Sequence, residues 1–298
     1  MPKKSAIALL ITIVFVMLIS VGLGVGLKYI NKSSKSLKAE NFTLQCVTIV
    51  EDFLNILKNS PDLEQVKDAD SLAIFLGQAS VIPFESSGYR VLISIKSARA
   101  KLNPIIFRKK ERLEALKTFL LNRGVNAEYA DIMQDMLNGM KADATYNSDV
   151  FNEHPYLFRD YIASKEHLAQ LNSIYKNRYH ENSIDKIDMD ELFRIGNEDV
   201  NASKIDLNYA TPLAWELMLG CDKARAEELN SLGFGAYSKE SPPFLSDEEK
   251  SNLNRFNFSY YEGVVAIKIE INRDEEKAVI NFEYNIKSKK GYNFDWQV

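Results

Sequence analysis

VAIKIEINRDEEKAVINFEYNIKSKKGYNFDWQV, residues 265–298, is the most regular stretch of this 298-residue chain. Apolar and polar side chains alternate along it with a period of two, and polar turns fall at residues 272–276 and 288–291. This pattern predicts a three-stranded antiparallel meander with one apolar face and one mostly polar face. The apolar face of such a sheet needs a second element to cover it.

A helical stretch that ends near residue 60 is the predicted cover. Its apolar side chains recur close to the helical period. They are Cys46, Ile49, Val50, Phe53, Leu54, Ile56 and Leu57. Ser60 precedes Pro61, and proline disfavours helix at the residue before it, so we expect the helix to end there. We call this helix the stem.

Two strands and a block of helices are predicted between the stem and the meander. Residues 79–84 and 89–95 have strand patterns, whereas residues 108–232 have the helical period. Within that block, Ser164 is a predicted N-cap, residues 190–195 a short helix, and Pro212 sits in the first turn of another.

The predicted fold class is α+β, with the stem packed on the C-terminal antiparallel sheet and a large all-α insertion between them. Two helices around Gly220 resemble a helix-hairpin-helix unit within that insertion.

The N-terminus has the composition of a membrane segment. Lys3 and Lys4 precede an uncharged, mostly apolar run from Ala6 to Leu27. A helix of that length rises about 33 Å, enough for a bilayer core of roughly 30 Å. The basic flank favours the cytoplasmic side, so we expect the bulk of the chain to be exported.

Three interpretations of this segment are open. A cleavable signal peptide usually has a shorter apolar core, and a plain signal anchor is not cleaved at all. A prepilin-type leader would instead be cut between Ala6 and Ile7. The mature helix would then begin with Ile7, Ala8, Leu9, Leu10 and Ile11.

The chain as a whole resembles a known family. Segments at residues 102–103 (LN), 154–156 (HPY), 164–168 (SKEHL) and 205–212 (IDLNYATP) occur in the order typical of that family. Together with the leader and stem, they resemble the type II secretion minor pseudopilins, specifically the large K-type subunit (general secretion pathway protein K). The residues that carry its signature here are Leu102, Asn103, Leu207, Asn208 and Ala210.

This resemblance implies a pilin-like fold and a role in assembly. The family's subunits form a short periplasmic pseudopilus, and the K-type subunit caps it together with other minor pseudopilins. The implied partners are those subunits, the inner-membrane secretion platform and the prepilin peptidase, which cuts the leader; the new N-terminus can be methylated. The implied location is the bacterial inner membrane, with a single pass, a cytoplasmic N-terminus and a periplasmic bulk.

Position 11 fits a subunit at the tip. Most pilin-like subunits carry a glutamate as the fifth mature residue, where it can pair with the N-terminal ammonium of a neighbour. Here that residue is Ile11. An unpaired carboxylate in an apolar bundle is costly, so a subunit with no neighbour above it tolerates an apolar side chain.

The resemblance divides the chain into five parts. They are the leader (1–6), the transmembrane helix (7–27), the stem with the first strands (28–107), the helical insertion (108–240) and the terminal meander (241–298). Ala6 departs from the family, which usually has glycine before the scissile bond.

No cofactor is expected. The family's insertion often carries an acidic calcium-binding segment, but residues 138–143 offer few oxygen ligands here, and calcium needs six to eight. A second acidic cluster lacks the spacing of an EF-hand loop. It comprises Asp185, Asp188, Asp190, Glu198 and Asp199.

Charge argues against nucleic acid as the main partner. With Lys3 and Lys4 set aside, the exported part has 35 Lys and Arg against 41 Asp and Glu, a net charge of −6. Phosphate binding needs a basic patch. The alternative function is a membrane-anchored helix-hairpin-helix protein of a DNA-uptake or type IV pilus system.

The sequence shows no pattern typical of an enzyme active site. The three histidines have no partner at metal-binding or catalytic spacing, so we expect no enzymatic activity. Cys46 and Cys221 could pair in an exported chain, but two independent thiols are the favoured interpretation.

Overall fold

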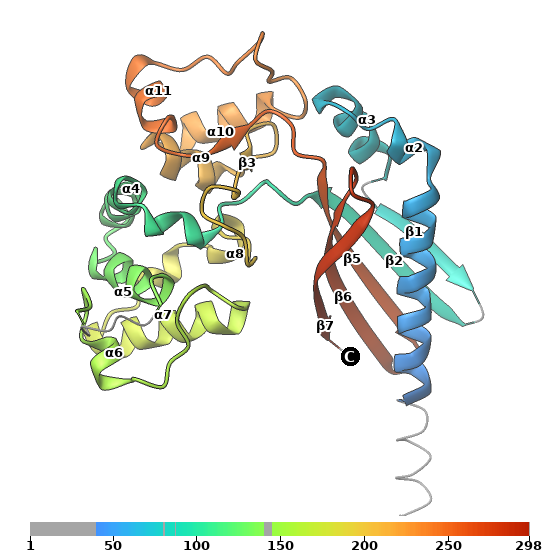
Figure 1. Ribbon diagram of the computed structural model, residues 1–298, viewed down its shortest axis with the longest axis horizontal. Coiled ribbons are helices and arrows are strands. Elements are labelled where there is room, and N and C mark those ends of the chain that lie inside the picture. Colours follow the sequence, from blue (N-terminus) through green and yellow to red (C-terminus); the bar gives the residue numbers. More distant parts are fainter. Residues whose placement is uncertain (1–39, 80, 87, 140–144, 298) are drawn as a thin grey trace, which may run out of the picture.

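The computed structural model describes residues 40–297 except residues 80, 87 and 140–144. Figure 1 shows two parts joined at one end. The sheet unit comprises residues 40–97 and 264–297, and the helical unit comprises residues 98–263. Each has its own buried apolar cluster, one from Phe42 to Ile286 through both segments of the sheet unit, the other from Leu102 to Phe256.

The sheet unit contains a five-stranded antiparallel sheet in the order β1-β2-β5-β6-β7. Its strands are β1 (Val81–Ser86), β2 (Tyr89–Ser97), β5 (Val264–Arg273), β6 (Glu276–Asn285) and β7 (Lys290–Gln297). The predicted C-terminal meander is therefore confirmed, and so is the α+β class.

The stem is helical over residues 40–59 and lies on one face of this sheet (Figure 1). Its buried side chains recur at helical spacing and meet the apolar face of the central strands. They are Phe42, Cys46, Val50, Phe53 and Leu57. Ile56, predicted to belong to this stripe, is instead 63% exposed, because it lies about 80° from the buried stripe's centre around the helix.

Two short helices follow the stem and were not predicted. Ser60 accepts a hydrogen bond from the backbone N–H of Leu63 and so caps α2 (Pro61–Glu64). Next comes α3 (Ala69–Ala79), which buries Leu72 and Leu76. The strand expected at residues 79–84 is corrected, since Ala79 ends α3 and β1 begins at Val81.

The last strand is irregular. The register between β6 and β7 shifts between Asn281 and Glu283, and Asn293 has φ of +55°, in the left-handed region. This is a β-bulge, which twists an edge strand away from regular pairing. Phe294 and Trp296 remain 41% and 38% exposed, although the alternating pattern predicts that they are covered.

The helical unit is built from short helices. They are η1 (Pro104–Arg108), α4 (Lys110–Leu121), α5 (Glu128–Leu137), α6 (Val150–Glu153), α7 (Lys165–Tyr179), η2 (Ser183–Lys186), α8 (Met189–Leu192), α9 (Pro212–Leu219), α10 (Lys223–Leu232) and α11 (Asp247–Leu253). Ser164 caps α7 and Pro212 starts α9, as predicted. The predicted helix at 190–195 ends earlier, since Phe193 is extended.

The insertion is not purely helical. Strand β3 (Ile205–Asp206) pairs in parallel with β4 (Phe258–Ser259), and Leu102 forms a parallel bridge with Phe193. These extended segments join each end of the helical unit to its middle, at Phe193 and at Ile205–Asp206, which the all-α prediction missed. The predicted domain limits at residues 108 and 240 stay predictions.

No helix in the stretch from residue 40 onward that the structure describes is both long and apolar enough to cross a membrane. The predicted span at 7–27 lies outside the described residues.

Candidate interaction surfaces

The two units are joined by two chain segments that run side by side. Ser97 pairs with Val265, and the N–H of Ala98 donates to the carbonyl of Val264 at 3.0 Å. The chain therefore leaves the sheet and returns to it at the same place. Several signature residues lie just beyond this junction.

Leu102 and Asn103 hold the first of these segments against the helical unit. Leu102 is buried, and its backbone exchanges hydrogen bonds with Leu192 and Arg194 at 3.0 and 2.9 Å. The Asn103 side chain accepts from the N–H of Ile105 at 3.0 Å and donates to the carbonyl of Gly196 at 2.9 Å. Both residues thus organise the local backbone.

Asn208 is the polar centre of the second signature segment. Its amide nitrogen donates to the carbonyls of Tyr237 and Tyr260 at 2.8 and 2.7 Å. Its amide oxygen accepts from the N–H groups of Gly235 and Tyr237 at 3.0 and 2.8 Å. Leu207 and Ala210 beside it are buried. The amide is saturated by backbone groups, so its role is structural.

A buried ion cluster crosses the junction. The guanidinium of Arg99 lies 2.8 Å from Glu283 of β6 and 2.7 Å from Glu198 of the helical unit. Arg194 pairs with the same Glu198 at 2.5 Å. Burial alone would lower the pKa of Arg99, but Glu283 and Glu198 outweigh it and the pKa is raised. The cluster links the helical unit to the polar face of the sheet.

Asp206 is a second buried charge at the junction. Its carboxylate accepts from the N–H groups of Asn208 at 3.1 Å and Glu262 at 3.0 Å. Removal from water raises the pKa of this carboxyl to about 7, although the two N–H groups oppose the shift. No sequence pattern indicates this burial, because it depends on β3, β4 and the junction together.

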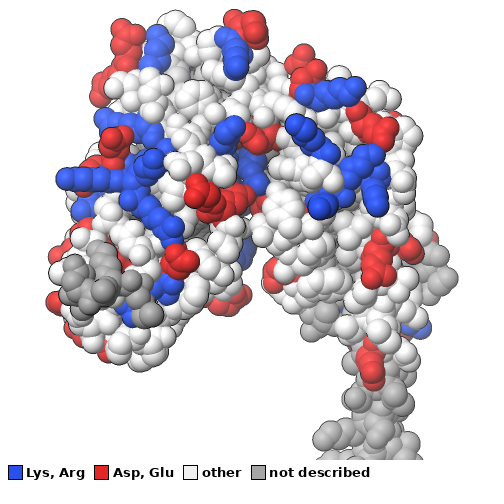
Figure 2. All heavy atoms as spheres, viewed as in Figure 1, with Lys and Arg blue, Asp and Glu red and all other residues white. Residues whose placement is uncertain are grey.

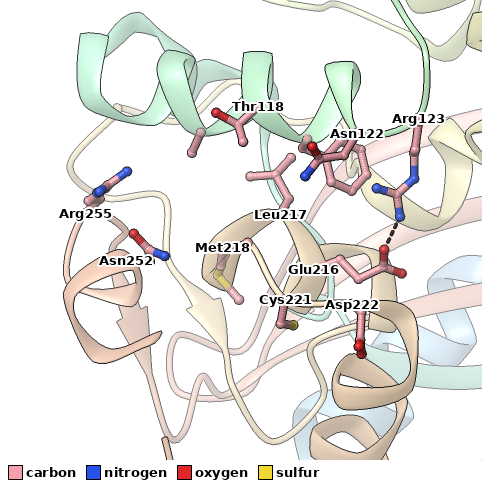
Figure 3. A pocket seen from close by; sticks show the side chains of 13 residues that line it. Thr118, Asn122, Arg123, Glu216, Leu217, Met218, Cys221, Asp222, Asn252 and Arg255 are labelled. Atoms are coloured by element: carbon pink, nitrogen blue, oxygen red, sulfur yellow. Dashed lines mark hydrogen bonds and ion pairs between the residues drawn. The ribbon is translucent and has the colours of Figure 1, made fainter. Parts of the chain in front are cut away.

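A pocket of about 550 Å³ opens where α4, the α9–α10 hairpin and α11 meet (Figure 3). Arg123 forms an ion pair with Glu216 at one end, and its guanidinium stacks over Phe119 at 3.8 Å. Asn252 and Arg255 lie at the other end (Figure 3). The thiol of Cys221 also lines the pocket, and burial raises its pKa to about 11. Such a thiol is protonated at neutral pH and is a poor nucleophile.

The hairpin at Gly220 does not favour a nucleic-acid phosphate. Asp222 accepts from the N–H of Arg225 and so places a carboxylate at the N-terminus of α10. Arg225 pairs with Glu228 and Glu249, and Lys223 pairs with Glu227. The backbone amides and cations that would hold a phosphate are thus already engaged.

The predicted acidic cluster is not assembled into a metal site. Asp185 pairs with Lys176 and Asp190 with Lys165. Asp188 caps α8, and Asp199 accepts from the N–H of Asn201. Glu198 belongs to the junction cluster. Within the residues that the structure describes, no group of three or more His, Cys, Asp and Glu side chains could hold a metal ion.

The cysteines and histidines behave as packing or surface residues. Cys46 and Cys221 are free, as favoured from the sequence, and belong to different units. His154 packs on Tyr156, His180 ends α7 with φ of +51°, and His167 accepts from the N–H of Ala163 at 3.2 Å. Burial lowers the pKa of His167. None of these contacts joins a nucleophile to a base.

Exposed apolar side chains flank the stem on both sides. On one side, the β7 flank consists of the exposed Val47 and the half-buried Leu54 of the stem with the exposed Phe294 and Trp296 of β7. On the other, the β1 flank consists of Ile56 of the stem with Ile82 and Phe84 of β1. Phe84 pairs with Val91 and Trp296 with Ile280, so both point to the stem side of the sheet. Sequence reasoning missed both flanks, because periodicity identifies a face but not where its cover ends.

Charges on the surface are mixed. On the face drawn in Figure 2, the two units form separate lobes, and acidic and basic side chains are interspersed on both. The predicted processing and bundle residues Ala6, Ile7, Ala8, Leu9, Leu10 and Ile11 lie outside the described residues.

Comparison with known proteins identifies the fold. No family model and no curated protein matches the chain. The structure is similar to a chain in the crystal structure of the GspK-GspI-GspJ complex from the enterotoxigenic Escherichia coli type 2 secretion system. The TM-score is 0.58 at 10% identity, over 89% of this chain and 99% of that chain. The chain therefore has a GspK-like minor pseudopilin fold, as the resemblance implies.

Proposed function

We propose that this protein is a minor pseudopilin of a type II secretion system that assembles with other minor pseudopilins at the tip of a periplasmic pseudopilus. The observation that carries the proposal is the GspK-like fold, found in a chain that also has a prepilin-like basic leader and apolar segment. GspK itself was solved in a complex with GspI and GspJ. Two smaller pseudopilins of that kind are the proposed partners.

In this proposal the N-terminal helix acts twice. Residues 7–27 anchor the precursor in the inner membrane, with the N-terminus cytoplasmic and the bulk periplasmic. After the prepilin peptidase cuts between Ala6 and Ile7, the same helix packs against the helices of partner subunits above the secretion platform. The work of the protein is assembly, with no catalytic step and no cofactor.

The attachment of the helical unit supports a place at the tip. Phe42, near the start of the described stem, stacks on Tyr89 at one end of β2. The helical unit leaves the sheet after Ser97, at the other end of the same strand. In a filament whose stems point to the membrane, this unit lies on the far side of the sheet. It would occupy the space that a further subunit needs.

The DNA-uptake alternative has weaker support. It rests on the helix–hairpin–helix arrangement of α9 and α10, whose lysine and arginine side chains are already paired with glutamates.

The proposal is tested by the mass of the N-terminus. The full chain is expressed in membranes with and without a prepilin peptidase. Loss of residues 1–6, with Ile7 first and methylated, is the expected result. An intact N-terminus under both conditions would make this a plain anchored protein and would remove the basis for assembly.

A further inference from the structure

We propose that the pocket between α4, the α9–α10 hairpin and α11 binds a short, extended peptide segment whose side-chain carboxylate lies at Arg255. The residues that line this pocket all belong to the helical unit. The inference therefore goes beyond the proposed function and does not depend on it.

The first argument is the size of the pocket. Its volume of about 550 Å³ lies within the range of about 300–1,000 Å³ that is usual for small-ligand sites. One wall is formed by Ala115, Thr118, Phe119 and Asn122, which recur one turn apart along α4 and its C-cap. From Ala115 to Asn122 this wall rises about 10 Å, which an extended peptide of about three residues spans. Leu217 and Met218 of α9 lie opposite it (Figure 3).

The second argument is the set of free hydrogen-bonding groups on the walls. The Asn122 side chain has no hydrogen-bond partner among the described residues. Asn252 donates its amide N–H to the carbonyl of Leu219 at 2.8 Å, which leaves its amide oxygen to accept. The Thr118 hydroxyl donates to the carbonyl of Glu114 at 3.0 Å, and its oxygen can still accept. The walls thus offer both donors and acceptors, as a peptide backbone requires.

The third argument is positive charge at the end of the pocket near α11. Arg255 is exposed and has no ion-pair partner among the described residues. Arg112 is only 5% exposed, and its Nε donates to the carbonyl of Arg255 at 2.6 Å. The Nη1 atom of Arg112 has no hydrogen-bond partner among the described residues. Two guanidinium groups without a paired carboxylate favour an anionic group at this end.

The opposite end of the pocket has the opposite character. Arg123 pairs there with Glu216, and the Asp222 carboxylate caps α10 at the same end (Figure 3). This end therefore has one arginine for two carboxylates, and a further carboxylate would be repelled from it. The difference between the two ends sets the orientation of the peptide, with its carboxylate at Arg255.

The test uses the native thiol of Cys221, which lines the pocket, as a reporter. The full chain in detergent is alkylated with iodoacetamide at pH 8, and mass spectrometry follows each cysteine. The probe is a pool of acetylated tripeptide amides with Asp or Glu in the centre and neither acidic residues nor cysteine at the flanks. We expect this pool to slow the alkylation of Cys221 severalfold and to leave Cys46, in the sheet unit, unchanged.

Two further pools identify the recognised group. A pool with Asn or Gln in the centre should protect Cys221 about tenfold less well, because it lacks the charge-assisted hydrogen bond. Equal protection by that pool would overturn recognition of a carboxylate. A pool of acetylated tripeptides with central alanine and a free C-terminal carboxylate should also protect less well, and stronger protection by it would overturn the assignment to a side chain. The absence of protection by every pool at millimolar concentration would overturn the site itself.

Variants locate the carboxylate in the pocket. Arg255→Gln should raise the half-protecting concentration of the acidic pool about tenfold, and Asn122→Ala about threefold. Arg90→Gln, the matched control in the sheet unit, should change it by no more than about twofold. All three residues are exposed, so the variants should fold normally. Protection of Arg255→Gln at the wild-type concentration would overturn the inference.

Discussion

The sheet unit and the helical unit bury their apolar side chains in different ways. Among the described residues, the smaller sheet unit has nine large apolar side chains exposed, several of them beside the stem, against six in the larger helical unit. The helical unit encloses Trp215, Tyr129 and Tyr175 completely. A bundle of short helices can surround its core, whereas one helix cannot cover five strands. The sheet unit thus leaves more of its apolar surface open to solvent than the helical unit does.

Deletion of the helical unit is the change with the largest expected effect, and it tests whether the two units have independent cores. Removing residues 99–263 and joining Ala98 to Val264 through a short Gly-Ser linker should leave a folded sheet unit, because these residues already share a backbone hydrogen bond. Far-UV circular dichroism and thermal unfolding would show a cooperative transition.

The control is a deletion of residues 108–240. It removes most of the helical core but leaves Leu102 and Phe256, both buried in it, without their neighbours. We expect this version to aggregate. If it unfolds as cooperatively as the first, the division into two cores is wrong.

Loss of the junction ion cluster should have the next largest effect, which is on the free energy of unfolding. Arg99→Met leaves Glu283 and Glu198 less than fully paired at a buried site, which should cost about 3–5 kcal/mol of unfolding free energy. Arg90→Met removes an exposed pair with Glu85 and should cost about 0–1 kcal/mol. Urea unfolding of both variants measures the difference. Equal losses would mean that the cluster does not join the two units.

Asp206 makes the junction sensitive to pH. Its pKa is raised to about 7 in the folded chain, against about 3.9 when unfolded. The folded state then holds the proton more tightly, so its stabilising contribution is full below about pH 4 and is lost as pH rises to about 7.

The stability of the wild type should therefore carry a downward slope of up to about 1.4 kcal/mol per pH unit from this group between pH 4 and 7. Asp206→Asn should lack that slope. Asp52→Asn, an exposed carboxyl on the stem, should retain it. Urea midpoints at pH 5, 6, 7 and 8 make the comparison, and parallel profiles for wild type and Asp206→Asn would contradict it.

Modification or reduction of the cysteines should have the smallest effect. Both thiols are free, and burial is the main cause that raises the pKa of each to about 11. Iodoacetamide at pH 8 should label the native chain slowly, with fully buried Cys46 slower than Cys221. A reductant should leave the thermal midpoint unchanged. A mobility shift on reduction would indicate a disulfide.

Local patterns predicted most of the elements. The strands β2, β5 and β6, the helices α4, α5, α7, α9 and α10, and the cap at Ser164 all follow from periodicity and end signals that lie within a few residues of each other. The same reasoning failed at α3 and α11, whose apolar patterns are short, and at β3 and β4, which are two residues each. Such short segments are stabilised by contacts with residues that are far away in the sequence.

Sequence patterns were enough to locate the apolar faces, the strands of the meander and most of the longer helices, because side-chain periods and caps act over a turn or two. Packing in three dimensions sets the remaining features: Asn208 is satisfied by backbone groups of Gly235, Tyr237 and Tyr260, Arg99 lies between two glutamates 85 residues apart in the chain, and the stem leaves β7 uncovered. Those features depend on which surfaces meet in the folded chain. Whether one helix covers a five-stranded sheet depends on the relative widths of the two elements.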